Sequence, residues 1–462
     1  MCINKENNLE RKLGLFSVTN IVVANMIGAG IFTTSGLLIK ELNDPVVMLL
    51  LWLVGGVIAL CGALSYGELG ATMPYAGGEY IFLSRLYHPL MGFLSGWVSF
   101  FVGFSAPIAA SSIGFTEYIA RAFPVIIDWG GIVNPVFIKK FYSILVIIIF
   151  TAIHLKGIEF GAIVQNYLTL SKVGLILCLL FIGFIFGKGN FNHFIYSEEF
   201  ILDFKKFKIL GLSLMWIMFA YSGWNASAYI GSEIKKPSRN LPLSLILGTG
   251  IVIILYFCLN IFYVFAIKPE AMKGVISVGG LAVKNLFGSS MESLFSMLIS
   301  FALFSSLSAF IILGPRVYYS MAKDGYFFKF VSDVHPVSHI PSKSIILQCL
   351  IAVIMVLSGT FEQILTYMGF SLGIFPILSV SGIFRLRSKL GSKYKLPGYP
   401  LVQLIYIISG VFILFLSFLQ RPVESSIAIL TVSAGVPVYF IFKKRYITDR
   451  KKIDYLKSRS KK

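Results

Sequence analysis

Long apolar runs alternate with short polar loops along the whole chain. A helix that crosses a membrane needs about 20 consecutive, mostly apolar residues. Twelve windows approach this pattern, and together they predict an all-α polytopic membrane protein with 12 transmembrane helices. The windows lie near residues 15–39, 45–66, 90–119, 136–154, 163–186, 209–230, 243–267, 291–317, 344–357, 363–384, 401–419 and 425–442.

The composition supports lipid as the solvent of this chain. Apolar residues make up 56% of it and charged residues 13%, whereas soluble proteins have about 45–50% and about 25%. The net charge of +19 resembles that of nucleic-acid-binding proteins. The basic residues, however, lie in short loops and in the tail 443–462, as expected at the cytoplasmic face of a membrane protein. We therefore expect a multi-pass protein of the cell (inner) membrane with both termini cytoplasmic, the lipid bilayer as a partner and no nucleic acid.

The cysteines are isolated along the chain, and with the histidines they do not form a Cys/His set with the full spacing of a metal site or a disulfide framework. We therefore expect no metal, no cofactor and no catalytic cluster. No His-Glu-x-x-His pattern is present, which argues against a membrane metalloprotease. No filter loop or ring of charge indicates a channel.

Glycines interrupt two of the predicted spans. The first reads IVVANMIGAGIFTTSG, with Gly28 and Gly30 at mid-depth, and the sixth reads MWIMFAYSGWNASAYIGSE, with Ser222 and Gly223 at mid-depth. Glycine also permits close packing of membrane helices. Because the first and sixth spans each head a group of five, the paired interruptions instead indicate an inverted repeat whose binding site lies at the breaks.

A broken helix suits an amino acid because it exposes both kinds of backbone group. The second half-helix, predicted to start near Gly30, presents N–H donors and a positive dipole end to a carboxylate. The preceding carbonyls, around Ile27 and Phe219-Ala220, suit an ammonium group. Glycine leaves room for the carboxylate to approach the backbone. The chain is therefore expected to bind the part that every amino acid shares.

Lys172 is the ionisable residue that lies clearly at depth within a span. Such residues are costly and functional by default, although a lysine near a helix end can extend to the interface. Lys172 lies about nine residues into its span, which favours a functional role. A further set of acidic residues lies near span ends, and we predict a solvated or loop-anchoring role for each: Glu68, Glu79, Glu117, Glu159 and Glu233.

Several motifs in order resemble the amino acid–polyamine–organocation (APC) superfamily, in particular bacterial members close to the L-type amino acid transporters. The resemblance runs from about residue 14 to residue 442. The motifs are GAGIF (28–32), LSYGELGATMPYAGGEYIFL (64–83), GFLSGW (92–97), FAYSGWNASAYIGSEIKKPSRNLPLSL (219–245), GPRVYYSMAKDG (314–325) and YKLPGYP (394–400).

The resemblance implies a five-plus-five inverted repeat (LeuT-type) with two additional helices. The division we predict is a cytoplasmic N-terminus 1–14, a first repeat 15–186, a periplasmic loop 187–208, a second repeat 209–384, a cytoplasmic loop 385–400, two further helices in 401–442 and a basic cytoplasmic tail 443–462.

The resemblance also implies site residues. The substrate-binding set is Ile27, Gly28, Ala29, Gly30, Ile31, Phe219, Ala220, Tyr221 and Ser222. Phe219 stands at the family's gate position. Lys172 matches a lysine whose amine replaces sodium in sodium-independent relatives, and Ser305 and Ser306 line that place.

The implied function is sodium-independent transport of amino acids by alternating access, either as proton symport or as exchange, with the amino acid and possible protons as the small-molecule partners. Where the L-type group often has AYDGW, this chain has AYSGW, with Ser222 in place of the acid. A neutral substrate is favoured because no Asp or Glu lies mid-span in the predicted third, sixth, eighth or tenth helix. Two alternatives stay open: an amino acid sensor on the same fold, and a transporter of cationic amino acids or polyamines.

Overall fold

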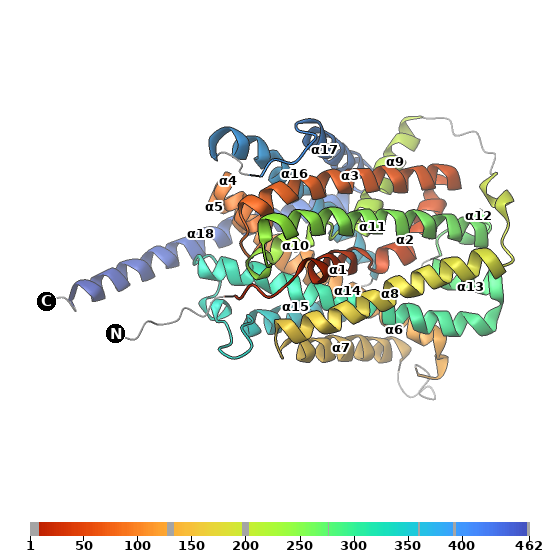
Figure 1. Ribbon diagram of the computed structural model, residues 1–462, viewed down its shortest axis with the longest axis horizontal. Helices are drawn as coiled ribbons and strands as arrows, with labels where there is room; N and C mark the ends of the chain where they lie inside the picture. The colour runs from red at the N-terminus through yellow and green to blue at the C-terminus, as the bar shows by residue number, and fades with distance from the viewer. Residues whose placement is uncertain are drawn as a thin grey trace.

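The computed structural model describes residues 9–126, 134–195, 203–275, 277–358, 361–390 and 394–459. Parts of the predicted termini and loops, namely residues 1–8, 196–202, 391–393 and 460–462, lie outside the described residues. The rest is a bundle of long helices that run along one common direction (Figure 1). Within the described ranges, β-pairing is limited to two isolated bridges, Leu13 with Ile234 and Ala76 with Ile230.

Ten helical segments are long and apolar enough to cross a membrane in the part of the chain that the structure describes. They comprise α1 (Leu15–Met26) with α2 (Ala29–Leu42), α3 (Pro45–Thr72), α5 (Pro89–Val98) with η1 (Ser99–Gly103) and α6 (Ser105–Ala122), α7 (Pro135–His154), α8 (Ile158–Phe186), α11 (Pro237–Ala266), α14 (Ser289–Lys323), α16 (Phe361–Arg385), α17 (Leu401–Gln420) and α18 (Pro422–Arg459).

The other two predicted windows correspond to α9 (Phe204–Ala220) and α15 (Ser342–Ser358), of 17 residues each. At about 1.5 Å per residue, such helices are about 25 Å long, slightly less than the hydrocarbon core of about 30 Å. The polytopic, all-helical character is therefore confirmed, whereas the count of twelve stays a prediction.

Short helices connect the long ones. They are α4 (Glu79–Leu86), α10 (Ala226–Tyr229), α12 (Pro269–Met272), α13 (Val278–Phe287) and the single turns η2 (Pro124–Ile126), η3 (Phe191–Phe194), η4 (Gly231–Glu233), η5 (Lys329–Ser332) and η6 (Leu386–Leu390). The N- and C-termini lie at the same end of the bundle, and α18 projects beyond it there (Figure 1). Helices α4 and α10 also lie toward this end, so they line the side of the site nearer to the termini.

Both predicted breaks are present, each with slightly different bounds. Helix α2 begins at Ala29, one residue before the predicted start, because Ile27 and Gly28 already leave the helical conformation. The second break extends over residues 221–225, between α9 and α10, and is longer than Ser222-Gly223. Gly223 has φ +102°, a conformation that only glycine adopts without strain.

The two broken helices run in opposite senses. Helix α1 lies toward the end with the termini and α2 away from it, whereas α9 lies away from the termini and α10 toward them (Figure 1). An inverted repeat produces this reversal. The reversal supports the predicted repeat, whose five-plus-five layout stays a prediction.

The solvated role predicted for the acidic residues is wrong for three of them, because Glu68, Glu79 and Glu233 are buried. Glu68 accepts hydrogen bonds from Arg387 at 2.7 and 2.6 Å and from the Leu396 amide at 3.2 Å. It thereby anchors the loop after α16, as the alternative role predicted. Buried charges need such partners, since unpaired burial is costly.

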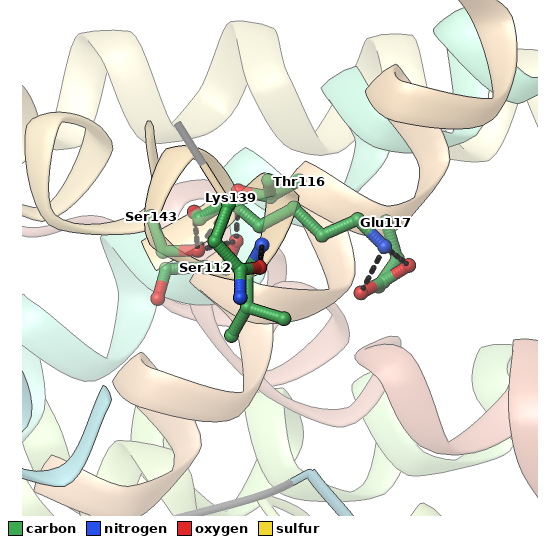
Figure 2. Close-up of polar contacts among 7 residues, drawn as sticks. Ser112, Thr116, Glu117, Lys139 and Ser143 are labelled. Atoms are coloured by element: carbon green, nitrogen blue, oxygen red, sulfur yellow. Dashed lines mark hydrogen bonds and ion pairs between the residues drawn. The ribbon is translucent and has the colours of Figure 1, made fainter. Parts of the chain in front are cut away.

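Helices α6 and α7 are joined by buried hydroxyl contacts and by an exposed ion pair at their rim, which Figure 2 shows in close-up. The hydroxyls of Thr116 and Ser143 lie 2.8 Å apart, and Lys139 donates to both oxygens of Glu117 at 2.9 and 2.8 Å. The lysine and glutamate side chains are 31% and 55% exposed. Pairs this exposed contribute little to stability.

Candidate functional site

The two helix breaks pack directly against each other. A Cβ on Gly30 would lie 2.7 Å from the Ala220 Cα, and a Cβ on Gly223 would lie 2.8 Å from the backbone carbon of Asn25. Real Cβ atoms do not approach other atoms so closely, and only glycine has no Cβ. The sequence thus places a glycine in each break where the backbone of the other break passes, which brings their free backbone groups together.

Lys172 on α8 holds the end of α1. Its Nζ donates to the Ala24 carbonyl at 3.2 Å, to the Ile27 carbonyl and to the Ser306 hydroxyl at 3.0 Å. Ser306 on α14 donates in turn to the Ile27 carbonyl at 2.6 Å. A helix C-terminus leaves carbonyls without intrahelical donors and favours positive charge. The buried amine therefore satisfies the polar groups that the first break exposes.

Ser305 lies beside this arrangement and has different partners. Its hydroxyl accepts from the Gln165 side-chain amide at 3.1 Å and lies 3.2 Å from the Thr169 hydroxyl, both on α8. Gln165 also donates to the Ser305 carbonyl at 3.0 Å. Of the two predicted serines, Ser306 is the one that the structure places in contact with Lys172.

Tyr256 on α11 joins both breaks, and the sequence analysis did not identify it. Its hydroxyl lies within hydrogen-bonding distance of the Met26 carbonyl at the end of α1 and 3.0 Å from the Ala220 carbonyl at the end of α9. The sequence alone does not show which segment a tyrosine in an apolar run contacts. It indicates only that the hydroxyl needs a hydrogen-bond partner if it is buried.

A cavity of about 20 Å³ lies where the breaks meet. Its lining includes Gly28, Gly30, Phe219, Ala220 and Ser222. Space of this size holds about one water molecule. An amino acid fits only after the lining helices move apart.

A larger cavity of about 100 Å³ adjoins the first. Asn25, Phe219, Ser222 and Phe310 line both cavities, and the larger one extends to Glu79 on α4. Phe219, predicted as the gate, is the last residue but one of α9 and borders both spaces. The arrangement gives the smaller cavity a neighbouring space on the side of α4 and α10.

The predicted substrate-binding residues fall into two groups. Gly28, Gly30, Phe219, Ala220 and Ser222 border the smaller cavity. The others have different places in the structure. Ala29 contributes backbone at the start of α2, and Ile31 is buried. The Tyr221 hydroxyl donates to the Trp52 carbonyl at 3.1 Å, and the Ile27 carbonyl accepts from Lys172 and Ser306.

The carbonyl of Ile27 is therefore saturated. A carbonyl oxygen has two lone pairs, and the Lys172 amine and the Ser306 hydroxyl use both. At the other break, the Phe219 carbonyl accepts from the Ser222 amide at 2.9 Å and the Ala220 carbonyl from the Tyr256 hydroxyl at 3.0 Å.

Comparison with known proteins identifies the family to which this chain belongs. Residues 13–441 match the family model described as amino acid permease. The chain belongs to this family. The predicted membership of the APC superfamily is thereby confirmed, and so is the prediction that the protein is a transporter rather than an enzyme.

Individual relatives cover nearly the whole chain. The serine/threonine exchanger SteT of Bacillus subtilis is 29% identical over 96% of this chain and 99% of its own length. The b(0,+)-type amino acid transporter 1 of Mus musculus is 25% identical over 95% of this chain and 89% of its own. The human cystine/glutamate transporter is 26% identical, with shares of 94% and 85%. All three are amino acid transporters, so this chain is a multi-pass membrane protein that transports amino acids.

Proposed function

We propose that the protein is a sodium-independent carrier of neutral amino acids that works by alternating access, as a proton symporter or an exchanger. It lies in the cytoplasmic membrane with both termini in the cytoplasm. The single observation that carries sodium independence is the contact of Lys172 with the oxygens of Ala24, Ile27 and Ser306. Carbonyls of unwound helices are sodium ligands in coupled transporters, and here the Lys172 amine contacts them. In exchange the amine would stay charged in place of sodium, and in proton symport it would cycle between its charged and neutral forms.

The substrate binds with its carboxylate at the start of α2 and its ammonium at the end of α9. The α2 N-terminus has no side-chain cap, so its amides are available to an anion. The carbonyls of Phe219, Ala220 and Ser222 receive the ammonium. Phe219 closes the site on the side of the larger cavity.

Neutral substrates are favoured by the lining of the smaller cavity, whose described residues include no Asp or Glu. Glu79, which lines the larger cavity, already accepts four hydrogen bonds. A cationic side chain would lose its hydration at the smaller cavity without gaining a counter-charge there.

Transport assays with the full-length protein in proteoliposomes test this proposal. Vesicles preloaded with a mixture of the twenty L-amino acids are diluted into the same labelled mixture, with sodium replaced by potassium in a parallel series. We expect counterflow of neutral amino acids that is equal in both media. Strict dependence on a sodium gradient would contradict the proposed role of Lys172, and binding without counterflow would identify a sensor instead.

A further inference from the structure

The carboxylate of Glu79 forms the centre of a second buried polar cluster, outside the predicted substrate site. Glu79 is the first residue of α4 and is 5% exposed. It follows Gly77 and Gly78, which both have positive φ. A Cβ on Gly78 would lie 2.5 Å from the Tyr229 ring, so these glycines let α4 start close against α10.

Four hydrogen bonds reach this carboxylate from three other helices and from the second break. Tyr66 on α3 donates at 2.9 Å, Tyr229 on α10 at 3.0 Å and Asn225 in the break at 2.8 Å, all to Oε1. Ser95 on α5 donates to Oε2 at 3.3 Å. We call these five residues the carboxylate clasp. Three of the four donors bind Oε1, whereas Oε2 accepts the single hydrogen bond of 3.3 Å from Ser95.

Glu79 differs from the other two buried glutamates because no Lys, Arg or His among the described residues forms an ion pair with it. Glu68 pairs with Arg387 and Glu233 with Arg316. A buried carboxylate with hydrogen bonds but no counter-ion has one further way to reduce its charge, which is to bind a proton.

The titratable and charged groups around the clasp are tyrosines or are engaged elsewhere. Tyr66, Tyr229 and, from α17, Tyr406 face Glu79. On the other elements packed against α4, Asp324 accepts from Tyr80 at 2.7 Å, Arg316 of α14 holds Glu233, and Arg385 of α16 donates to the Leu86 carbonyl at 3.2 Å.

The clasp is connected to the proposed substrate site through the larger cavity. Glu79, Ser95 and Asn225 line that cavity together with Phe219 and Ser222. Its volume of about 100 Å³ exceeds what one water molecule needs, so water that carries a proton fits beside the Glu79 side chain. Asn225 follows Ser222 by three residues in the same break, so a change at the clasp acts directly on the segment that presents carbonyls to the substrate.

We propose that Glu79 is a proton-binding site coupled to the transport cycle, an inference that rests on the proposed function. A proton from the aqueous phase adds to Oε2, and no other bond is made or broken. The neutral acid donates from Oε2, while its Oε1 becomes a weaker acceptor for Tyr66, Asn225 and Tyr229. The clasp loosens, and α10 can move away from α3 and α4, which opens the site on the side of the larger cavity.

The electrostatics of the site agree with this role. Burial raises the pKa of the Glu79 carboxyl above its ordinary value, and the hydrogen bonds from Tyr66, Tyr229, Ser95 and Asn225 oppose the rise without cancelling it. The carboxyl therefore titrates closer to neutral pH than a solvated glutamate does.

The test compares counterflow of the labelled amino acid mixture between pH 5.5 and pH 8.5 for the wild type, Glu79→Gln, Glu79→Asp and the exposed control Glu117→Gln. For the wild type and the control we expect a one-proton dependence, approaching tenfold per pH unit on the alkaline side of the transition. Glu79→Gln should transport at a rate that varies less than twofold over the range, and Glu79→Asp should keep the dependence with a displaced midpoint. An unchanged profile in Glu79→Gln would overturn the inference.

Thermal unfolding in detergent gives a readout that does not need transport. The pKa of the Glu79 carboxyl is higher in the folded than in the unfolded protein, so the folded state binds more protons and loses stability as pH rises through that interval. We expect the melting temperature of Glu79→Gln relative to the wild type to increase with pH. A melting-temperature difference between Glu79→Gln and the wild type that stays constant with pH would overturn the inference. This measurement applies even if Glu79→Gln folds too poorly for transport assays.

The two proposals fail in different ways. If no amino acid stabilises the purified wild type or undergoes counterflow, the proposed function fails. If counterflow is present and Glu79→Gln keeps the wild-type pH profile, the proton site alone fails.

Discussion

The two helix breaks expose the same kinds of backbone group, but oppositely charged side chains hold them. At the first break, the Lys172 amine donates straight to the carbonyls of Ala24 and Ile27. At the second, the Glu79 carboxylate accepts from the side chains of Asn225 and Tyr229. Lys172 thus contacts the backbone of the first break directly, whereas Glu79 contacts only side chains, those of Asn225 in the second break and of Tyr229 on α10.

The difference follows from where each charge can sit. The end of α1 concentrates carbonyl oxygens, and only a donor stabilises them. An amine with no acceptor capacity suits this role at any pH where it is charged. A carboxylate becomes a weaker acceptor when it binds one proton, so the second break is the one that we propose pH to release. The comparison therefore separates a fixed support from an adjustable one.

Replacing the cation should have the largest effect. Lys172→Met removes the donor to the Ala24 carbonyl and one of two donors to the Ile27 carbonyl. A buried polar group left without its partner costs about 1–3 kcal/mol, so counterflow should fall more than tenfold. Lys139→Met on the rim is the control. Counterflow within twofold of the wild type in Lys172→Met would mean that the first break needs no such support.

The contact between the breaks can be tested with a matched pair of glycines. Gly30→Ala places a Cβ 2.7 Å from the Ala220 Cα, whereas Gly28→Ala places one 3.8 Å from the nearest atom, the Ser306 hydroxyl oxygen. Overpacking costs about 1–3 kcal/mol, and an ordinary contact costs little. The melting temperature should drop by several degrees for Gly30→Ala and stay near the wild-type value for Gly28→Ala. Equal shifts would show that the breaks are not in close contact.

Tyr256→Phe should have a smaller effect, because it removes one hydroxyl that serves both breaks. The loss of its hydrogen bond to the Met26 or Ala220 carbonyl should lower the free energy of unfolding by about 1 kcal/mol. Tyr263→Phe on the same helix is the control, since the buried Tyr263 hydroxyl has no hydrogen-bond partner among the described residues. A melting temperature equally low in both variants would assign the effect to packing instead.

The smallest effect is expected at the rim. Glu117→Gln removes the charge that Lys139 contacts (Figure 2). An exposed pair contributes about 0–1 kcal/mol, so thermal unfolding in low and in high salt should differ little from the wild type. A melting temperature lowered as far as that of Gly30→Ala would show that this exposed pair stabilises the bundle as much as the contact between the breaks does.

The sequence allowed the spans and the breaks to be predicted, because both depend on local features. Apolar length locates helices such as α7 and α17 to within a few residues, and paired glycines locate the interruptions. A lysine deep in an apolar run predicts a function for Lys172, although not its partners.

The remaining features depend on contacts between distant segments. Glu79 looked like an ordinary charge at a span end, since nothing in the sequence brings it to Asn225, 146 positions away. The role of Tyr256 is equally invisible, because a hydroxyl in an apolar run can face any neighbouring helix. The bounds of the second break also differ from the prediction, since the turn needs the residues on both sides of Gly223.

The reciprocal glycines have a consequence for how the sequence can vary. Each of Gly30 and Gly223 accommodates main chain from the opposite half, at Ala220 and Asn25. A larger residue at either glycine is tolerated only if the facing segment shifts, and that shift displaces the other contact as well. Substitutions at these four positions should therefore be coupled among relatives, so that the two halves diverge together even though they are far apart in the chain.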